Sequence, residues 1–236
     1  MTATVGAPVV AGARWDPPAA IAVRGTVVLL PGRGEHAGVY DRFGRRLAAD
    51  GYAVRSATPE TAAAVAATAT APLVLAGSDT GALHALALAT PLGAAGVIAA
   101  GVPWDPPRAP SLLSWDAELE ARSACPTHRA RLEADGGFQR GTLAAAVPPD
   151  LAASVDPAAV AVPVLLVHGE ADPIAPPSGA RALAARLPRA ELATVRDGRH
   201  DALNDITHRT VAAHVVQWLE RLRSDPDALR PILTVS

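Results

Sequence analysis

Short runs of apolar residues alternate along the chain with longer stretches that are rich in Ala and Leu. The short runs have the length of strands, and the longer stretches have the length of helices. Several runs stop at Gly or Pro, which interrupt regular structure. This alternation is typical of an α/β protein, in which helices flank a mostly parallel central sheet.

Six runs are predicted to form strands. The clearest is the run 162–167, and the run 26–30 is rich in Val and Leu and stops at Pro31 and Gly32. The predicted strands are 26–30, 52–56, 72–76, 95–102, 162–167 and 191–195.

Three stretches are predicted to form helices. The last of them has large apolar residues at helical spacing, which predicts one buried face. The predicted helices are 40–50, 82–89 and 207–223, and the apolar face of the last consists of Val211, Val215, Trp218 and Leu222.

The segment 103–157 interrupts the alternation, because it shows no strand pattern and is rich in Pro, Trp, Arg and acidic residues. We interpret it as a small helical insertion that forms a cap over the carboxyl edge of the sheet. A long surface excursion with no lid role is the alternative. The chain has 236 residues, which is long enough for one well-buried domain and short for two. We therefore expect a single domain over 1–236.

The composition is ordinary for a soluble globular protein, since half of the residues are apolar and about a fifth are charged. The formal charge of −2 gives no sign of a nucleic-acid or anionic-membrane partner. No apolar run approaches the roughly 20 residues of a membrane span. The amino-terminal residues lack the pattern of a signal peptide. We expect a cytoplasmic protein, and its oligomeric state stays open.

Composition also limits covalent and metal chemistry. Cys125 is the only cysteine, so no internal disulfide can form. No group of Cys and His residues has the spacing of a zinc site. We therefore expect no metal and no cofactor.

The sharpest chemical signal lies at residues 73–82, which read Leu-Val-Leu-Ala-Gly-Ser-Asp-Thr-Gly-Ala. A predicted strand runs into two glycines that bracket three residues, and an Ala-rich helix follows. This is the pattern of a nucleophile elbow, with Asp79 at its centre. The glycines allow a tight turn and close backbone packing. The helix amino terminus favours an anion there, which suits a carboxylate.

Three further motifs, two of which begin in a predicted strand, carry candidate functional residues. Residues 27–36 read Val-Val-Leu-Leu-Pro-Gly-Arg-Gly-Glu-His, and residues 164–174 read Val-Leu-Leu-Val-His-Gly-Glu-Ala-Asp-Pro-Ile. Gly198-Arg199-His200 precedes the last predicted helix. Together with the elbow, these motifs resemble the α/β-hydrolase superfamily over most of the chain. The loop 32–36 is similar to that of monoacylglycerol-lipase-type members. The Asp in the elbow resembles that of epoxide hydrolases and haloalkane dehalogenases.

The resemblance implies a role for each motif. Asp79 takes the place of the nucleophile, His200 that of the catalytic histidine and Asp172 that of its supporting acid. Asp105 is an alternative acid, as in some dehalogenase-like members. The residues expected to donate to an oxyanion or to contact substrate are Arg33, Thr80, Gly32, His36 and Trp104. Trp104 is equally suited to anchoring the cap.

The chain departs from the family pattern in three places. The oxyanion loop begins with Pro31-Gly32, where the family usually has His-Gly. The loop 57–60 lacks the usual Asp-x-x-Gly-x-Gly pattern, and the helical stretch after it is short. Asp79 replaces the usual serine, and an alternative register would make Ser78 the nucleophile. The glycine frame favours Asp79.

An aspartate at the elbow changes the expected substrate. A carboxylate that attacked an ester would form an anhydride, which lies uphill. When it attacks a saturated carbon, it forms an ordinary ester. His200, oriented by Asp172, would then activate water against that ester. We therefore expect a hydrolase of epoxides or alkyl halides. Thr80 stands where dehalogenases carry a halide-binding Trp, which favours epoxides.

The sequence does not decide which residue donates a proton to the epoxide oxygen when the ring opens. The epoxide hydrolases that this elbow resembles use cap tyrosines, and the predicted cap has none. Both tyrosines, Tyr40 and Tyr52, belong to the main domain. His36, Glu35 and His128 are the alternatives.

A second class of function follows from the same residues. Asp79 and Asp172 would flank His200 with two negative charges, which predicts a raised pKa for the imidazole. Such a pair suits acid–base chemistry without a covalent step, such as isomerisation, cyclisation or dehydration, or simple substrate binding. A degenerate esterase that has lost its serine is a third possibility.

Overall fold

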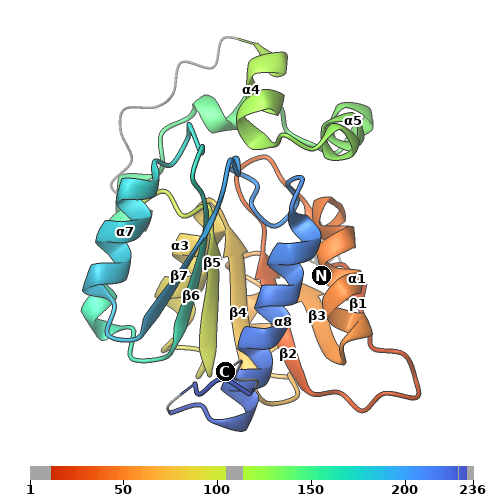
Figure 1. Cartoon of the computed structure of the whole chain (residues 1–236), viewed down its shortest axis with the longest axis vertical. Coiled ribbons are helices and arrows are strands. Elements are labelled where there is room, and N and C mark those ends of the chain that lie inside the picture. The colour runs from red at the N-terminus through yellow and green to blue at the C-terminus, as the bar shows by residue number, and fades with distance from the viewer. Residues whose placement is uncertain (1–11, 105–113, 228, 233–236) are drawn as a thin grey trace, which may run out of the picture.

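A seven-stranded sheet forms the centre of the computed structural model, which describes residues 12–104, 114–227 and 229–232 (Figure 1). The strand order is β1-β3-β2-β4-β5-β6-β7. Only the pairing of β1 with β3 is antiparallel. The strands are β1 (Arg14–Trp15), β2 (Gly25–Leu30), β3 (Tyr52–Ser56), β4 (Leu73–Ser78), β5 (Gly96–Ala100), β6 (Val164–Gly169) and β7 (Ala190–Val195). The mostly parallel sheet predicted from the sequence is confirmed.

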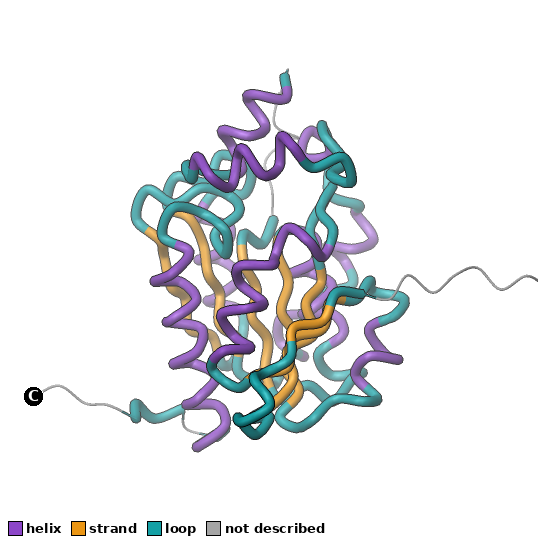
Figure 2. Tube along the Cα trace, turned by 90° about the vertical axis from the view of Figure 1, so that its right-hand side faces the viewer, coloured by secondary structure: helices purple, strands orange, loops and turns teal. Residues whose placement is uncertain are grey.

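Helices cover both faces of the sheet, which explains why its central strands are apolar without alternation. On β2, Val27 and Leu29 pack on one face, and Val28 and Leu30 pack on the other. The first face is covered by α1 (Asp41–Ala49) and α8 (His208–Ser224). The second is covered by α2 (Ala62–Ala66), α3 (Thr80–Leu88) and α7 (Pro177–Arg186). Figure 2 shows these layers from the side.

The apolar face predicted for the last helix is confirmed, since its four large residues are all buried. The predicted strand boundaries differ most from the structure at β4, β5 and β6, by at most two residues at either end. At its carboxyl end, β4 continues through Gly77 to Ser78. A glycine usually weakens a strand, but here it permits the approach of α3. A Cβ atom at Gly77 would lie 2.1 Å from the carbonyl oxygen of Gly81.

The described part of the insertion between β5 and β6 is helical, as predicted, and lies over the carboxyl end of the sheet (Figures 1 and 2). Residues 105–113, and Asp105 with them, lie outside the described residues. The elements of the insertion are α4 (Trp115–Arg122), α5 (Pro126–Ala134), η2 (Thr142–Ala144), α6 (Pro149–Ala153) and η3 (Pro157–Ala159). A further short helix, η1 (Ala37–Tyr40), precedes α1.

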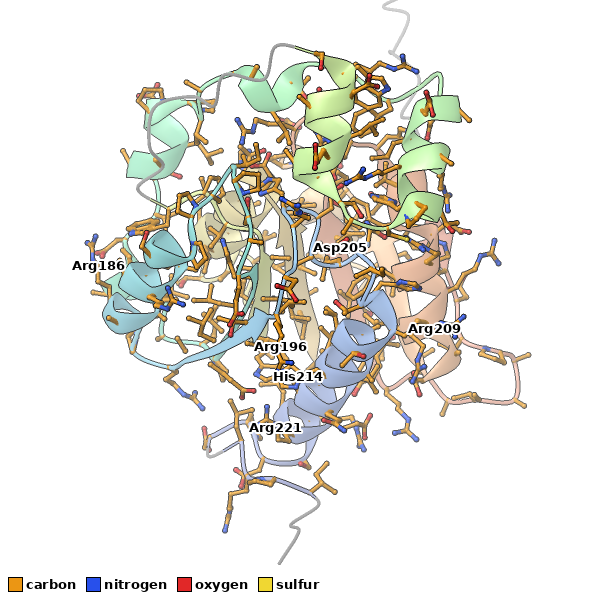
Figure 3. All side chains as sticks on the ribbon, turned by 45° about the horizontal axis from the view of Figure 1, so that its top comes forward. Arg186, Arg196, Asp205, Arg209, His214 and Arg221 are labelled. Carbon is orange, nitrogen blue, oxygen red and sulfur yellow. The ribbon has the colours of Figure 1, made fainter. Side chains whose placement is uncertain are left out.

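The insertion is joined to the loop before α8 by main-chain and side-chain hydrogen bonds. His200 N donates to Ala121 O at 3.2 Å, and Asp201 N donates to Arg122 O at 2.8 Å. The Ser123 hydroxyl donates to Asp205 at 2.8 Å, and Figure 3 shows Asp205 between the insertion and α8. The carboxyl end of α4 is therefore part of the wall that holds this loop. No helix in the described ranges is both long enough and apolar enough to cross a membrane.

Candidate active site

Asp79 is the single residue that turns the chain from β4 into α3. Its backbone is at φ 51° and ψ −126°, a conformation that L residues rarely adopt. Gly81 makes room for the turn, because a Cβ atom there would lie 2.1 Å from the carbonyl oxygen of Leu30. Such a backbone costs about 1–3 kcal/mol, and residues of this kind cluster at functional sites. The Asp79 side chain is almost fully buried.

Two cationic side chains face the Asp79 carboxylate. Oδ2 accepts from the Arg33 backbone N–H at 2.9 Å and from Arg33 Nε at 2.7 Å. Oδ1 accepts from Arg33 Nη2 at 2.8 Å. His200 Nε2 lies 3.4 Å from the same Oδ1. The guanidinium therefore binds both oxygens as a fork, and the imidazole meets one of them.

Asp172 fixes the imidazole from the other side. His200 Nδ1 lies 2.8 Å from Asp172 Oδ2. The other oxygen of Asp172 accepts from the backbone N–H groups of Ile174 and Ala175, at 2.8 and 3.0 Å. Because Nδ1 meets a carboxylate, it carries a proton, and Nε2 is turned toward Asp79. The three side chains that the sequence predicted to act together are thus in one row.

The charged neighbours of His200 and Asp79 oppose the effect of burial on the pKa of each of these two groups. Burial works to lower the pKa of His200, but the charge and hydrogen bond of Asp172, together with Asp79, raise it to about 10. Burial works to raise the pKa of Asp79, but His200 and Arg33 hold it far below its usual range. At neutral pH the site therefore contains an imidazolium between two carboxylates.

Arg33 also connects Asp79 with the insertion. Its Nη1 donates to the carbonyl oxygen of Ala145, and its side chain is only 12% exposed. Arg33 therefore covers the carboxylate from the side of the cap.

A second buried cluster of charges lies beside the first, around Arg122. Its guanidinium lies 3.0 Å from Glu118, 3.4 Å from Glu35 and 3.5 Å from Asp201. His128 Nε2 lies 3.1 Å from Asp201. This cluster was not predicted from the sequence. The i,i+4 pair of Glu118 and Arg122 within the insertion was the available signal, but such pairs are usually exposed.

Glu35 orders the loop that carries Arg33. Its Oε2 accepts from Gly32 N at 2.8 Å and from the hydroxyl of Tyr40. Burial, and then the charge of Asp201, raise the pKa of Glu35 above its usual value. Arg122 Nη2 donates to the carbonyl oxygen of Arg33 at 2.8 Å. The loop 32–36, which carries the Arg33 N–H donor and is called the donor loop below, is thus held by the second cluster.

The architecture agrees with that of known enzymes. The structure of a monoacylglycerol lipase from Paleococcus ferrophilus matches with a TM-score of 0.71 and 22% identity, over 88% of this chain and 96% of that one. A soluble variant of monoglyceride lipase from Saccharomyces cerevisiae, in complex with a substrate analogue, matches with a TM-score of 0.70 and 18% identity, over 88% and 90% of the two chains. The chain has the α/β-hydrolase fold.

Further comparisons agree with the α/β-hydrolase fold. An esterase from Thermogutta terrifontis matches with a TM-score of 0.61 and 19% identity, over 89% of this chain and 93% of that one. The family model described as TAP-like protein matches residues 143–228. None of the curated proteins compared with the chain matches it. These neighbours are lipases and esterases, and at such identities they show the fold alone.

Within the α/β-hydrolase fold, two more predicted residues lie at Asp79. Thr80 is the first residue of α3, immediately after the elbow. Gly32 packs against the elbow, since a Cβ atom there would lie 2.8 Å from Asp79 Cβ. Ser78, the alternative nucleophile, is buried and faces the Tyr40 hydroxyl. The turn therefore presents Asp79, and not Ser78, to His200.

Two other predicted residues contact different partners. His36 Nε2 lies 2.8 Å from Asp135, and 41% of its side chain is exposed. The Trp104 ring lies against the guanidinium of Arg186 on α7, with 5.4 Å from Cζ to the ring centroid. Figure 3 shows Arg186 at the outer side of α7. The structure thus places Trp104 where it can anchor the chain entering the insertion.

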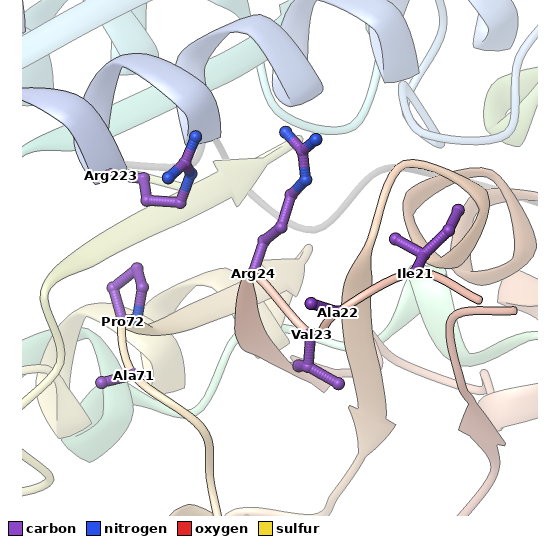
Figure 4. A pocket seen from close by; sticks show the side chains of 7 residues that line it. All are labelled: Ile21, Ala22, Val23, Arg24, Ala71, Pro72 and Arg223. Carbon is purple, nitrogen blue, oxygen red and sulfur yellow. The ribbon is translucent and has the colours of Figure 1, made fainter. Parts of the chain in front are cut away.

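A surface pocket of about 500 Å³ lies at the amino ends of β2 and β4, the opposite end of the strands from Asp79 (Figure 4). Both arginines that line it, Arg24 and Arg223, pair with Glu220 at 2.9 Å. The pocket is therefore separate from the candidate active site. In the described ranges, no three His, Cys, Asp or Glu side chains form a group that could hold a metal ion.

Proposed function

We propose that this protein is a hydrolase in which Asp79 attacks a saturated carbon, with an epoxide favoured over an alkyl halide. One observation carries the proposal. The Asp79 carboxylate stands at the apex of the elbow with Oδ2 on the Arg33 N–H group and Oδ1 at 3.4 Å from His200. One oxygen thus lies on the loop donor, and the other is the candidate nucleophile.

The two oxygens of Asp79 would have different tasks. Attack by Oδ1 gives an alkyl ester whose carbonyl oxygen is Oδ2. When water adds to that ester, negative charge develops on Oδ2, where the Arg33 N–H and Nε–H groups already point. Donors of this kind are worth about 3 kcal/mol each. Arg33 Nη2 must leave Oδ1 before the attack, so substrate entry requires the guanidinium to move.

His200 would gain its basicity from the first step. The charge of Asp79 helps to hold the imidazole protonated, and esterification removes that charge. The pKa of His200 then falls, while Asp172 still orients the ring. A neutral Nε2 can take a proton from the attacking water.

The similar structures are lipases and esterases, so the support for an aspartate nucleophile comes from the elbow itself. Arg33 and His200 stabilise a carboxylate at this position, and Asp172 holds the His200 ring. A carboxylate has no productive route through an ester carbonyl, because the product would be an anhydride. Epoxides are electrophiles that such a group can open.

Labelled water tests the proposal. A single turnover of 1,2-epoxyhexane in H₂¹⁸O should place one ¹⁸O atom in the Asp79 carboxylate, because water attacks Cγ and Oδ1 leaves with the diol. Mass spectrometry of the peptide that contains Asp79 measures the label. Asp79→Asn should stop turnover, whereas Asp150→Asn, at an exposed position on α6, should not. Turnover without label in Asp79 would refute the covalent route.

A non-covalent acid–base reaction is the second candidate. Both oxygens of Asp79 already accept hydrogen bonds from Arg33, and the pKa of the carboxyl is strongly lowered. A weakly basic carboxylate is a weak nucleophile, which favours a role in holding the His200 imidazolium. Substrate turnover with neither an adduct nor a label on Asp79 would support this candidate.

A further inference from the structure

Opening an epoxide needs a proton for the leaving oxygen, and in the structure the hydroxyl of each tyrosine already donates to a glutamate. The Tyr40 hydroxyl donates to Glu35. The Tyr52 hydroxyl donates to Glu220 of α8 at 2.6 Å, and Tyr52 begins β3 at the end of the strand remote from the elbow. Each hydroxyl proton is therefore engaged by a carboxylate other than Asp79.

The other acids considered from the sequence are also engaged elsewhere. His36 pairs with Asp135 near the surface. His128 is fully buried and pairs with Asp201. Glu35 accepts hydrogen bonds from Gly32 N and from the Tyr40 hydroxyl. Arg33 touches Asp79, but a guanidinium does not deprotonate in proteins, so it can polarise a leaving oxygen without giving it a proton.

His200 remains the acid that faces the elbow. Its Nε2 is buried and has no hydrogen-bond partner in the described part of the chain. The 3.4 Å approach to Asp79 Oδ1 is a close ion pair, not a directed hydrogen bond. The proton on Nε2 is therefore available to an oxygen atom that binds beside Oδ1.

We propose that His200 serves twice, first as the acid that protonates the leaving epoxide oxygen and then as the base that activates water. This inference rests on the proposed function, because it deepens the reaction of the same site. It explains how the reaction proceeds without a tyrosine in the cap.

The proton and electron balance of the two steps closes. Oδ1 forms a bond to the epoxide carbon, the carbon–oxygen bond breaks, and the oxygen takes its electron pair and the Nε2 proton. Neutral His200 then takes a proton from water as the water oxygen bonds to Cγ. The Cγ–Oδ1 bond breaks, and the released oxygen takes the second proton of that water. The products are a diol, the Asp79 carboxylate and the His200 imidazolium.

The groups around His200 keep it protonated before the reaction. Asp172 and Asp79 lie against its two nitrogens. His168 lies 3.4 Å from Asp172, and burial lowers its pKa, so it stays neutral and adds no competing charge. Asp201 follows His200 and is paired with Arg122 and His128. An acid of pKa about 10 still holds its proton at neutral pH and can donate to an alkoxide.

Two matched electrophiles test the inference with His200→Gln. The probes are 1,2-epoxyhexane, whose leaving oxygen needs a proton, and 1-iodohexane, whose iodide does not. The measured quantity is the single-turnover rate of adduct formation on Asp79. Loss of a general acid should slow alkylation by the epoxide about 100-fold or more, while alkylation by the iodide should change little. His214→Gln on α8 (Figure 3), where the side chain pairs with Glu191, is the matched control and should alter neither rate.

Three outcomes would overturn the inference. One is an unchanged epoxide rate in His200→Gln, which would show that another group gives the proton. Another is an equal loss with both probes, which would show a structural effect on the elbow. The third is a wild-type epoxide rate that does not fall as the pH rises through about 10. This last measurement needs neither a variant nor the iodide. If the wild-type protein forms no adduct on Asp79 with either probe, the proposed function itself fails.

Discussion

At the scale of single residues, Asp79 combines two unfavourable features. Its backbone lies in a region that L residues rarely adopt, and its charge is buried. Both cost free energy, and glycine would remove both costs. An aspartate at this position therefore indicates a function for the carboxylate itself, which Arg33 and His200 hold in place.

The groups around Asp79 should support catalysis by a serine at the same position. In Asp79→Ser, the hydroxyl would stand at the apex of the elbow beside His200, with the Arg33 N–H as an oxyanion donor. The pKa of His200 would fall because one of its two carboxylates is gone. We expect newly gained hydrolysis of p-nitrophenyl acetate. The double variant with His200→Gln is the control, and equal rates in the two variants would contradict the expectation.

The elbow should also be sensitive to a single methyl group. In Gly81→Ala the new Cβ would lie 2.1 Å from Leu30 O, and overpacking of this kind typically costs 1–3 kcal/mol. We expect a loss of about 2–3 kcal/mol in the free energy of unfolding, measured with urea. Gly136→Ala, in an exposed turn where the Cβ would meet nothing within 4 Å, is the control. Similar stabilities of the two variants would argue against the packing described.

At the scale of elements, α4 connects the cap with two loops of the candidate active site. Its carboxyl end accepts hydrogen bonds from His200 N and Asp201 N. Arg122, on the same helix, contacts the donor loop through Arg33 O and Glu35. This half of the insertion therefore forms part of the wall of the candidate site.

Removal of Arg122 should be strongly destabilising. In Arg122→Met the three carboxylates of Glu35, Glu118 and Asp201 would stay buried without their cation. Breaking a buried ion pair on one side costs about 3–5 kcal/mol, and urea unfolding should show a loss of that size. Arg46→Met breaks an exposed i,i+4 pair with Asp50 and should cost at most about 0.5 kcal/mol. A loss for Arg122→Met no larger than this would show that the cluster adds nothing to stability.

At the scale of the whole molecule, stability should depend on pH through the imidazolium. Folding raises the pKa of His200 from 6.5 to about 10. Its contribution to stability is therefore fully present below pH about 6.5 and is lost as the pH rises toward 10. The lowered pKa of Asp79 works in the opposite sense, since its contribution is present above pH about 4 and is lost on acidification.

Chemical denaturation at several pH values checks this coupling. The free energy of unfolding of the wild-type protein should decrease from pH 7 to pH 10, and the decrease should be smaller in His200→Gln. The same slope in both proteins would mean that His200 is not the titrating group. His214→Gln should keep the wild-type slope, because its imidazole is partly exposed.

The local pattern of apolar residues was sufficient to predict most strands of the sheet. The runs of buried apolar residues and their glycine and proline stops set the six parallel strands within a few residues. β1 escaped prediction because a two-residue strand has no period to detect. The glycines around Asp79 located the elbow because its backbone requires them.

The sequence by itself determined the α/β layering, the elbow and the row of Asp79, His200 and Asp172, because each depends on short motifs whose order along the chain maps onto neighbouring strand ends. Only the tertiary structure decided that Arg33 binds Asp79 and that Arg122 holds Glu35. These partners are 46 and 87 residues apart. Their pairing depends on which loops the sheet and the insertion bring together. Hydrophobic periodicity carries no information about such pairings, because an arginine has the same local pattern whichever carboxylate it meets.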